Sequence, residues 1–138
     1  ETERNLHLLQ VLLFDLLSES TQKVETSSTN SEFNQFLQLV DVNFKEQKSV
    51  QFYLRELSVS EKKLASLSKL HMGMSSLQII HHRLLLEAKR LLLFAEESHK
   101  EIAYSLGFDS PASFSAFIKK KEGKTPSELQ IQLEEIHK

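Results

Sequence analysis

The sequence of 138 residues contains no cysteine, only three glycines and only two prolines. The absence of cysteine excludes a disulfide framework and thiolate metal sites, and it fits a reducing cytosol. Because helix-breaking residues are so few, the chain should be nearly all helical with short connections. With 40% hydrophobic residues, it is long enough to bury the core of one domain or of two very small ones.

Long apolar runs are also missing. No run approaches the roughly 20 residues that span a bilayer, and the charge distribution shows no signal peptide. The sequence therefore predicts a soluble, cytoplasmic protein with no membrane partner.

Motifs for catalysis and cofactor binding are absent. The chain has no nucleophile beside a base, no glycine-rich phosphate loop and no paired-carboxylate motif. His81 and His82 are adjacent, so on a helix they diverge by about 100°, and no third ligand stands four residues away on either face. We expect no enzyme activity, no cofactor and no metal site.

The net charge of −2 is unevenly distributed along the chain. Residues 1–30 carry two basic and five acidic side chains, whereas the remaining residues carry 15 basic and 14 acidic ones. Any affinity for nucleic acid must therefore come from a localised set of lysines.

The first 19 residues have the spacing of an amphipathic helix. Leucines recur at three- and four-residue intervals over residues 3–18, so one stripe of this helix must pack on another surface. Residues 20–30 are rich in serine and threonine, a composition typical of a flexible linker. A compact domain should begin near Ser31, with helices at about 31–45, 48–57 and 60–71.

A long helix is predicted over about 75–97. Ser75 and Gln78 have the spacing of a capping box, in which two side chains satisfy free amides at the helix start. At 1.5 Å per residue, roughly 22 residues would span about 33 Å, nearly one turn of B-DNA along its axis. The apolar stripe that would pack against a body on each side consists of Leu77, Ile80, Leu84, Ala88, Leu91 and Ala95.

Two segments about 50 residues apart are similar. At a constant offset of 50, the matched residues are Ser60, Leu64, Leu67, Gly73 and Ser75 with Ser110, Phe114, Phe117, Gly123 and Thr125. Before the preceding turn the offset is 49, and it pairs Leu54, Leu57 and Val59 with Ala103, Leu106 and Phe108. A turn absorbs a gain or loss of one residue without rotating either helix. The pattern favours a duplicated helix-turn-helix.

Capping chemistry over residues 98–129 predicts three helix starts. The pairs with the spacing of capping boxes are Ser98 with Glu101 and Thr125 with Glu128. Gly107 suits the left-handed residue that ends a helix, and Ser110 followed by Pro111 suits the start of the next. A helix-turn-helix built this way leaves the outer face of its second helix free for a DNA major groove.

These features resemble the DNA-binding domain of the AraC/XylS family of bacterial transcription activators. The resemblance covers about 100 residues, from near Phe36 to the end of the chain. The segments that carry it are residues 83–92, residues 101–108 (EIAYSLGF), Ser113-Phe114-Ser115 with Lys119 and Lys120, and residues 123–126.

The resemblance implies an all-α fold in which a linker helix, 75–97, joins two helix-turn-helix subdomains, 31–74 and 98–138. Each subdomain would be a homeodomain-like bundle, and an extra amphipathic helix would precede them. The implied function is a sequence-specific transcription regulator that inserts two recognition helices into successive major grooves. Its implied partners are double-stranded DNA and RNA polymerase.

The family also implies an N-terminal sensor or dimerisation domain. Residues 1–19 would be the last helix of that domain, and the effector site would lie outside the present residues. Residues 3–18 could then pair with the same helix of a second subunit to form a homodimer.

Helical geometry places the DNA-facing positions independently. The expected core residues are Leu64, Leu67 and Leu70 in 60–71, and Phe114, Phe117 and Ile118 in 110–121. The opposite faces hold Lys62, Ala65, Ser66 and Lys69, and Ala112, Ser115, Ala116 and Lys119. Together with the helix start, the base-facing candidates are Lys62, Ala65, Ser66, Pro111, Ala112, Ser113, Ser115 and Ala116.

Neither outward face carries arginine, asparagine or glutamine, the residues that discriminate bases through paired hydrogen bonds. Ala116 stands where the family commonly has arginine, and Ile118 replaces its usual phenylalanine. Specificity should rest on thymine methyl contacts, on Lys62, on water and on DNA deformability. The alternative is that one or both helices no longer read bases.

Phosphate contacts are better supplied. Helix starts present free amides to anions, and lysines lie along or just beyond both recognition helices. The candidates are Lys69, Ser75, Ser76, Lys119, Lys120, Lys124 and Thr125.

A second function class remains open, because helix-turn-helix folds also serve protein contacts. The nearly neutral charge, the 3–18 helix and the outward Ala65, Ala112 and Ala116 would suit a helical protein-interaction module that has kept the scaffold but not DNA readout.

Overall fold

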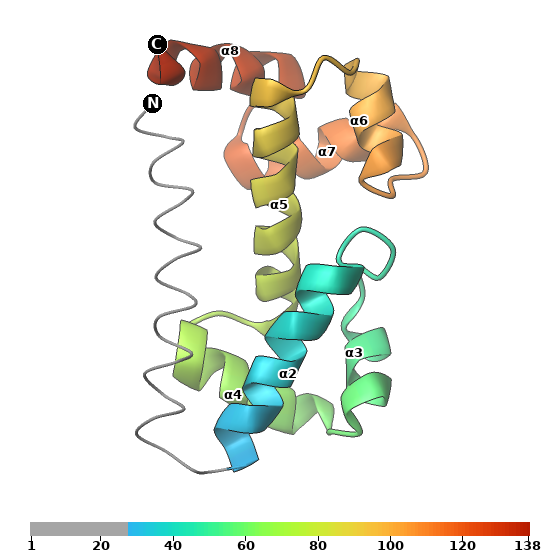
Figure 1. The fold of residues 1–138 in the computed structure, drawn as a ribbon, viewed down its shortest axis with the longest axis vertical. Helices are drawn as coiled ribbons and strands as arrows, with labels where there is room; N and C mark the ends of the chain where they lie inside the picture. Colours follow the sequence, from blue (N-terminus) through green and yellow to red (C-terminus); the bar gives the residue numbers. More distant parts are fainter. Residues whose placement is uncertain (1–27) are drawn as a thin grey trace. The chain divides into compact units, whose positions relative to one another are not determined.

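The structure, a computed structural model, describes the backbone of residues 28–138 and the side chains of residues 31–138. Over this range it is built from α-helices, without a strand, which confirms the all-α prediction (Figure 1). The helices are α2 (Ser28–Asn43), α3 (Val50–Leu57), α4 (Glu61–Met72), α5 (Ser76–Phe94), α6 (His99–Ser105), α7 (Pro111–Glu122) and α8 (Pro126–His137).

The described helices form two compact units that divide within α5. The N-terminal unit, as described, runs from residue 28 to Arg83, and the C-terminal unit runs from Leu84 to Lys138. None of the described helices has the length and apolarity that crossing a membrane requires.

The start of α2 differs from the expected boundary. The expected helix at 3–18 and most of the expected linker at 20–30 lie outside the described residues, but α2 already begins at Ser28. Serine, threonine and asparagine suit linkers by composition, yet they are also favoured where helices begin, because their side chains bond free backbone amides. Composition alone therefore placed the helix start three residues too late.

Aromatic packing builds the core of the N-terminal unit. Helix α2 buries Phe33, Phe36 and Val40 at helical spacing, and Phe44, directly after its last residue, is buried too. Tyr53 of α3 meets the Phe36 ring edge-on, with 5.6 Å between centroids. Its hydroxyl donates to the Gln47 carbonyl at 2.7 Å, so the one polar atom of this fully buried side chain is satisfied.

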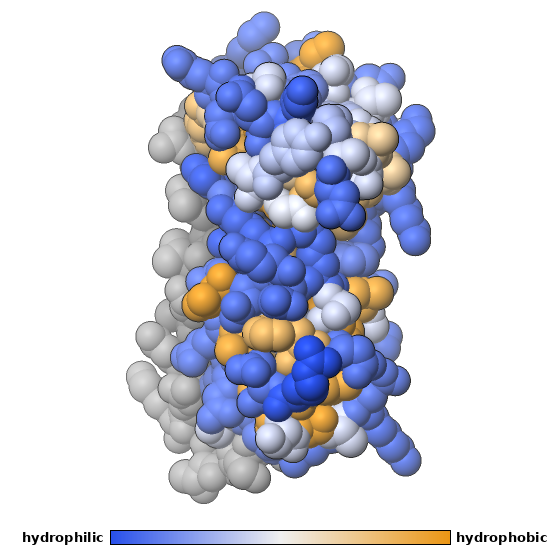
Figure 2. All heavy atoms as spheres, turned by 90° about the vertical axis from the view of Figure 1, so that its right-hand side faces the viewer, coloured by the Kyte–Doolittle hydropathy of each residue, from blue (hydrophilic) through white to orange (hydrophobic). Residues whose placement is uncertain are grey.

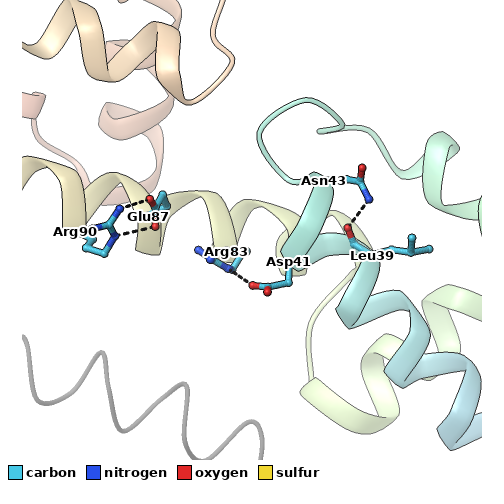
Figure 3. A network of polar contacts seen from close by, with 6 residues as sticks. All are labelled: Leu39, Asp41, Asn43, Arg83, Glu87 and Arg90. Carbon is cyan, nitrogen blue, oxygen red and sulfur yellow. Dashed lines mark hydrogen bonds and ion pairs between the residues drawn. The ribbon is translucent and has the colours of Figure 1, made fainter. Parts of the chain in front are cut away.

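The first half of α5 is fixed to the end of α2 by Arg83. The Arg83 Nε donates to the Asp41 carboxylate at 2.9 Å (Figure 3). The Arg83 guanidinium also lies 4.2 Å from the centroid of the Phe44 ring. The close-up also shows Glu87 and Arg90, an ion pair within α5 that belongs to the C-terminal unit. These contacts orient α5 against α2 within the N-terminal unit.

Helices α5 to α8 supply the core of the C-terminal unit. Its buried apolar residues are Leu84, Ala88, Leu91, Leu92, Ile102, Ala103, Leu106, Phe114, Ile118, Leu129 and Leu133. Gln130 links α8 to the end of α5 and to the start of α6. Its Nε2 donates to the Leu92 carbonyl at 2.8 Å, and its Oε1 lies 2.8 Å from the His99 Nε2 in a hydrogen bond.

The long helix is shorter than predicted. Helix α5 ends at Phe94, so Ala95 of the expected stripe lies beyond it, and Leu77 is 41% exposed rather than buried. Glu96 and Glu97 would place negative charge at the negative end of the helix dipole, and Ser98 begins the next helix. The helix therefore stops before these residues.

The expected core of α4 is wrong at one position. Leu70 is 75% exposed, and Ser68 is fully buried in its place. At 100° per residue, Ser68 lies about 40° from Leu64, whereas Leu70 lies about 120° away and reaches the side of the helix. The Ser68 hydroxyl is satisfied by the Leu64 carbonyl at 2.8 Å and the Ser76 hydroxyl at 2.9 Å.

Candidate nucleic-acid interface

Each unit contains a helix-turn-helix whose turn is closed in the same way. In the N-terminal unit, Ser58 ends α3 in the left-handed conformation with φ of 54°, and the Val59 amide donates to the Leu54 carbonyl at 3.2 Å. This backbone bond satisfies a carbonyl left free at the end of the helix.

Gly107 takes the same role in the C-terminal unit. Its φ is 84°, and the Phe108 amide donates to the Ala103 carbonyl at 3.0 Å. The bonds of the two turns join residues that correspond at the offset of 49, so the sequence repeat is also a structural repeat.

The recognition helices α4 and α7 are capped alike at their starts. The Ser60 hydroxyl accepts the Lys63 amide at 3.0 Å, and the Ser110 hydroxyl accepts the Ser113 amide at 3.1 Å. Pro111 occupies the first turn of α7, where its missing amide costs nothing.

Both recognition helices also end alike. Gly73 and Gly123 adopt left-handed conformations with φ of 69° and 74°. Their amides donate to the carbonyls of Lys69 and Lys119 at 3.0 Å and 2.9 Å. The start and stop signals thus give two recognition helices of equal length, 12 residues each.

The base-facing candidates lie on the outer surface of these helices. Seven of the eight are exposed: Lys62, Ala65, Ser66, Ala112, Ser113, Ser115 and Ala116. Pro111 is half-buried at the start of α7. The structure gathers three of them on α4 and five on α7, in separate units.

The phosphate candidates are placed less uniformly. Lys69, Lys119, Lys120 and Thr125 are exposed, and Ser75 and Lys124 are half-buried. Ser76 is only 6% exposed and its hydroxyl bonds Ser68, so any contact that Ser76 makes to a phosphate must use its backbone amide.

The starts of α5 and α8 are closed by the predicted capping boxes. The Ser75 hydroxyl accepts the Gln78 amide at 3.1 Å, and the Ser75 amide donates to the Gln78 side chain at 2.9 Å. Thr125 and Glu128 make the corresponding pair of bonds at 3.2 Å and 2.8 Å.

Lysines gather near the start of α8. The Thr125 amide, and then its side chain, hold the pKa of the Glu128 carboxyl below its usual value, and the charges of Lys119 and Lys124 lower this pKa further. Lys119 and Lys124 thus add positive charge near the Glu128 carboxylate in the first turn of α8.

One exposed side chain of α4, Leu70, was expected in the core. Leu70 projects from α4 at the position that corresponds to Lys120 in α7. Its angle about the helix axis would have shown this, but its hydrophobicity favoured a core assignment. The space-filling view in Figure 2 shows a largely hydrophilic face with small hydrophobic patches.

No group of three potential metal ligands occurs among the described residues.

A family model described as a helix-turn-helix domain matches residues 53–132, more than half of the chain. The chain is 24% identical over 126 residues to the HTH-type transcriptional activator RhaS of Salmonella schwarzengrund (strain CVM19633), an alignment covering 91% of this chain and 45% of RhaS. The chain belongs to the AraC/XylS family of bacterial transcription regulators.

Solved structures of AraC/XylS type have the same fold. The C-terminal domain of AraT, a response regulator from Geobacillus stearothermophilus, is 24% identical with a TM-score of 0.67, covering 73% of this chain and 84% of that one. An AraC-type regulator from Chromobacterium violaceum is 24% identical with a TM-score of 0.65, covering 77% and 95%.

The DNA-binding domain of AdpA, solved in complex with a target DNA, is 22% identical with a TM-score of 0.62, covering 72% of this chain and 90% of that one. The similarity of this chain to these three solved structures is a similarity of fold. The chain spans about half the length of the curated AraC/XylS relatives that it matches.

Proposed function

We propose that this AraC/XylS chain places α4 and α7 in successive major grooves of one DNA duplex and thereby regulates transcription in a sequence-specific manner. The observation that carries the proposal is the repeated geometry. Two helix-turn-helix turns with matching backbone bonds hold two recognition helices of equal length, each with an exposed outer face.

The residue roles follow from position along each helix. The N-terminal residues of a recognition helix reach base edges, so Lys62, Ala65 and Ser66 of α4 would contact bases in one groove. The corresponding surface of α7 comprises Pro111, Ala112, Ser113, Ser115 and Ala116. Phosphates would be held by the side chains of Lys69, Lys119, Lys120, Lys124 and Thr125, and by amides at the starts of α5 and α8.

The proposal extends to the location and the partners of the full protein. Because RhaS is named a transcriptional activator, we expect the full protein to act in the bacterial cytoplasm and to contact RNA polymerase. A homodimer through residues 3–18, an effector site outside these residues, and the absence of enzyme activity complete the proposal. The parts proposed for the chain are an amphipathic helix at 1–19, a linker that ends where α2 begins, a first helix-turn-helix subdomain up to residue 74, the linker helix α5 and a second helix-turn-helix subdomain at 98–138.

The test is salt-dependent binding to duplex DNA. Sequences selected from random duplexes should bind the chain with an affinity that falls as salt rises, because lysines release condensed counterions from phosphates. Lys69→Ala and Lys119→Ala should each weaken binding and reduce the slope of log K against log salt by about 0.9. Lys138→Ala removes the same charge at the end of the chain and is the matched control.

Absence of duplex binding at low salt by a chain with intact helical circular dichroism would overturn the proposal. A helical protein-interaction module would then remain. Equal effects of Lys138→Ala and Lys119→Ala would instead remove the phosphate roles, because the effect would reflect net charge alone.

A further inference from the structure

The two recognition helices differ in where their lysines are concentrated: α4 has lysines in its first turn as well as Lys69 near its end, whereas α7 has them only in its last turn. At the offset of 50, Lys62 in the first turn of α4 corresponds to Ala112 in α7, and Lys63 corresponds to Ser113. The Lys63 side chain points toward α2, because its Nζ forms an ion pair with the Glu32 carboxylate at 2.8 Å. Lys62 is therefore the cation presented by the outer face at the start of α4.

The asymmetry reverses toward the helix ends. Residues 119, 120, 121 and 124 of the C-terminal unit are all lysines, whereas the corresponding residues are Lys69, Leu70, His71 and Met74. Leu70 is 75% exposed, so an apolar group stands on the surface where α7 presents Lys120. Lys121 leans toward its own helix, with its Nζ 6.0 Å from the centroid of the Phe117 ring.

These ends of a recognition helix face different parts of DNA. Residues in the first turns contact base edges, where a lysine can bond the O6 and N7 acceptors of guanine. Lysines near the helix end and the next helix start reach phosphates, which position the protein but carry no sequence information directly. Lys62 is thus placed to discriminate a base, and Lys119, Lys120 and Lys124 are placed to anchor.

Helix α7 has little chemistry with which to discriminate. Its outward Ala112 and Ala116 offer only methyl groups, which can contact a thymine methyl. The Ser113 hydroxyl lies 3.1 Å from the Ser110 hydroxyl within the cap. Ser115 supplies a hydroxyl, which can bond several bases and therefore selects weakly.

We infer that the two units divide recognition, with α4 reading sequence through Lys62 and α7 anchoring the chain to phosphates. This inference rests on the proposed function. The expected DNA site has two unequal parts: a segment under α4 in which one guanine is preferred beside thymines, and a segment under α7 in which most substitutions are tolerated.

Selection from random duplexes with the whole chain tests the division. Because the chain has no cysteine, Ala65→Cys or Ala116→Cys gives a single thiol for a DNA-cleaving reagent, and the cleavage pattern shows which segment each helix occupies. We expect the sequence preference to be concentrated where the reagent on residue 65 cuts. A preference concentrated under residue 116, or divided equally, would overturn the inference.

Exchanging corresponding residues between α4 and α7 tests base recognition and phosphate binding separately. Lys62→Ala should reduce the guanine preference by about tenfold, and adding Ala112→Lys should create one in the other segment. Lys120→Leu should weaken binding to all duplexes alike and reduce the salt slope by about 0.9, and adding Leu70→Lys should restore the slope.

Two results distinguish this inference from the proposal on which it rests. If no duplex binds at low salt, the proposed function fails. If duplexes bind but Lys62→Ala weakens all of them equally, DNA binding stands and the division of labour is wrong, because Lys62 then contacts phosphate rather than base.

Discussion

Ser58 is the only non-glycine residue with a left-handed backbone in the part of the chain that the structure describes. A side chain in this conformation brings Cβ close to the following carbonyl, which costs roughly 1–2 kcal/mol. Gly107 avoids this cost at the corresponding turn of the C-terminal unit. The first helix-turn-helix is therefore strained at a point where the second is not.

Exchanging these two residues should have opposite effects. Ser58→Gly should raise the free energy of unfolding by about 0.5–1 kcal/mol, since relief of strain exceeds the greater entropy of glycine in the unfolded chain. Gly107→Ser should lower it by about 1–2 kcal/mol. Urea denaturation followed by circular dichroism measures both. Destabilisation by Ser58→Gly would mean that the serine side chain compensates for the strain.

Tyr53 makes stability depend on alkaline pH. Burial, and then the Glu46 carboxylate, raise the pKa of Tyr53 from 10.0 to about 12. The phenol ionises more readily in the unfolded chain, so its stabilising effect is fully present below pH 10 and is lost as pH rises from about 10 to about 12. A shift of this size corresponds to about 2–3 kcal/mol.

Tyr53→Phe isolates this effect. At neutral pH the variant should be less stable by about 1 kcal/mol, because it lacks the hydrogen bond to the Gln47 carbonyl. Above pH 10 the difference should shrink and then change sign, because phenylalanine does not ionise. Unfolding free energies of both proteins at pH 8 and pH 11.5 provide the measurement, and a difference that is independent of pH would contradict the assignment.

At the scale of the elements, helix starts could be predicted because each depends on a few adjacent residues. The Ser75–Gln78, Ser98–Glu101 and Thr125–Glu128 capping boxes all form. The positive φ of Gly107 was likewise predictable, since glycine suits this conformation best. Local chemistry was sufficient for these features, and it gave the two recognition helices their bounds to within a residue or two.

Burial was less predictable because it depends on what a helix packs against. Ser68 is buried in α4 where α7 buries Ile118, and Ser76 is buried where α8 has Pro126. In the N-terminal unit two hydrogen-bonded serines thus stand where the C-terminal unit has two apolar residues. A polar pair of this kind has no sequence signal until both partners are known to be adjacent, so Leu70 was placed in the core instead.

At the scale of the whole chain, duplication could be predicted from residue spacing, and the resemblance to the AraC/XylS family is confirmed by the comparisons. The exposure of the outer positions of α4 and α7 followed from helical period and capping. The difference in lysines between α4 and α7 is already present in the sequence, and the structure adds that the residue corresponding to Lys120 is an exposed leucine, Leu70, rather than a core residue.

The proposed tandem binding predicts that the length of α5 between the two units affects DNA affinity. The helix is continuous from Ser76 to Phe94, and the two units divide between Arg83 and Leu84. One alanine inserted at this boundary would turn one unit by about 100° about the helix axis relative to the other and move it by about 1.5 Å. Each unit would keep its own core, including the Arg83–Asp41 ion pair of the N-terminal unit.

The insertion should therefore leave the stability of the units nearly unchanged and lower the affinity for a selected duplex by at least tenfold, because both recognition helices could no longer enter their grooves together. A duplex carrying only the segment under α4 should bind the parent and the insertion variant equally, since it engages one unit. Gel retardation of both duplexes at one salt concentration makes the comparison. If the variant binds the complete duplex as tightly as the parent does, the two units do not bind as a tandem fixed by α5.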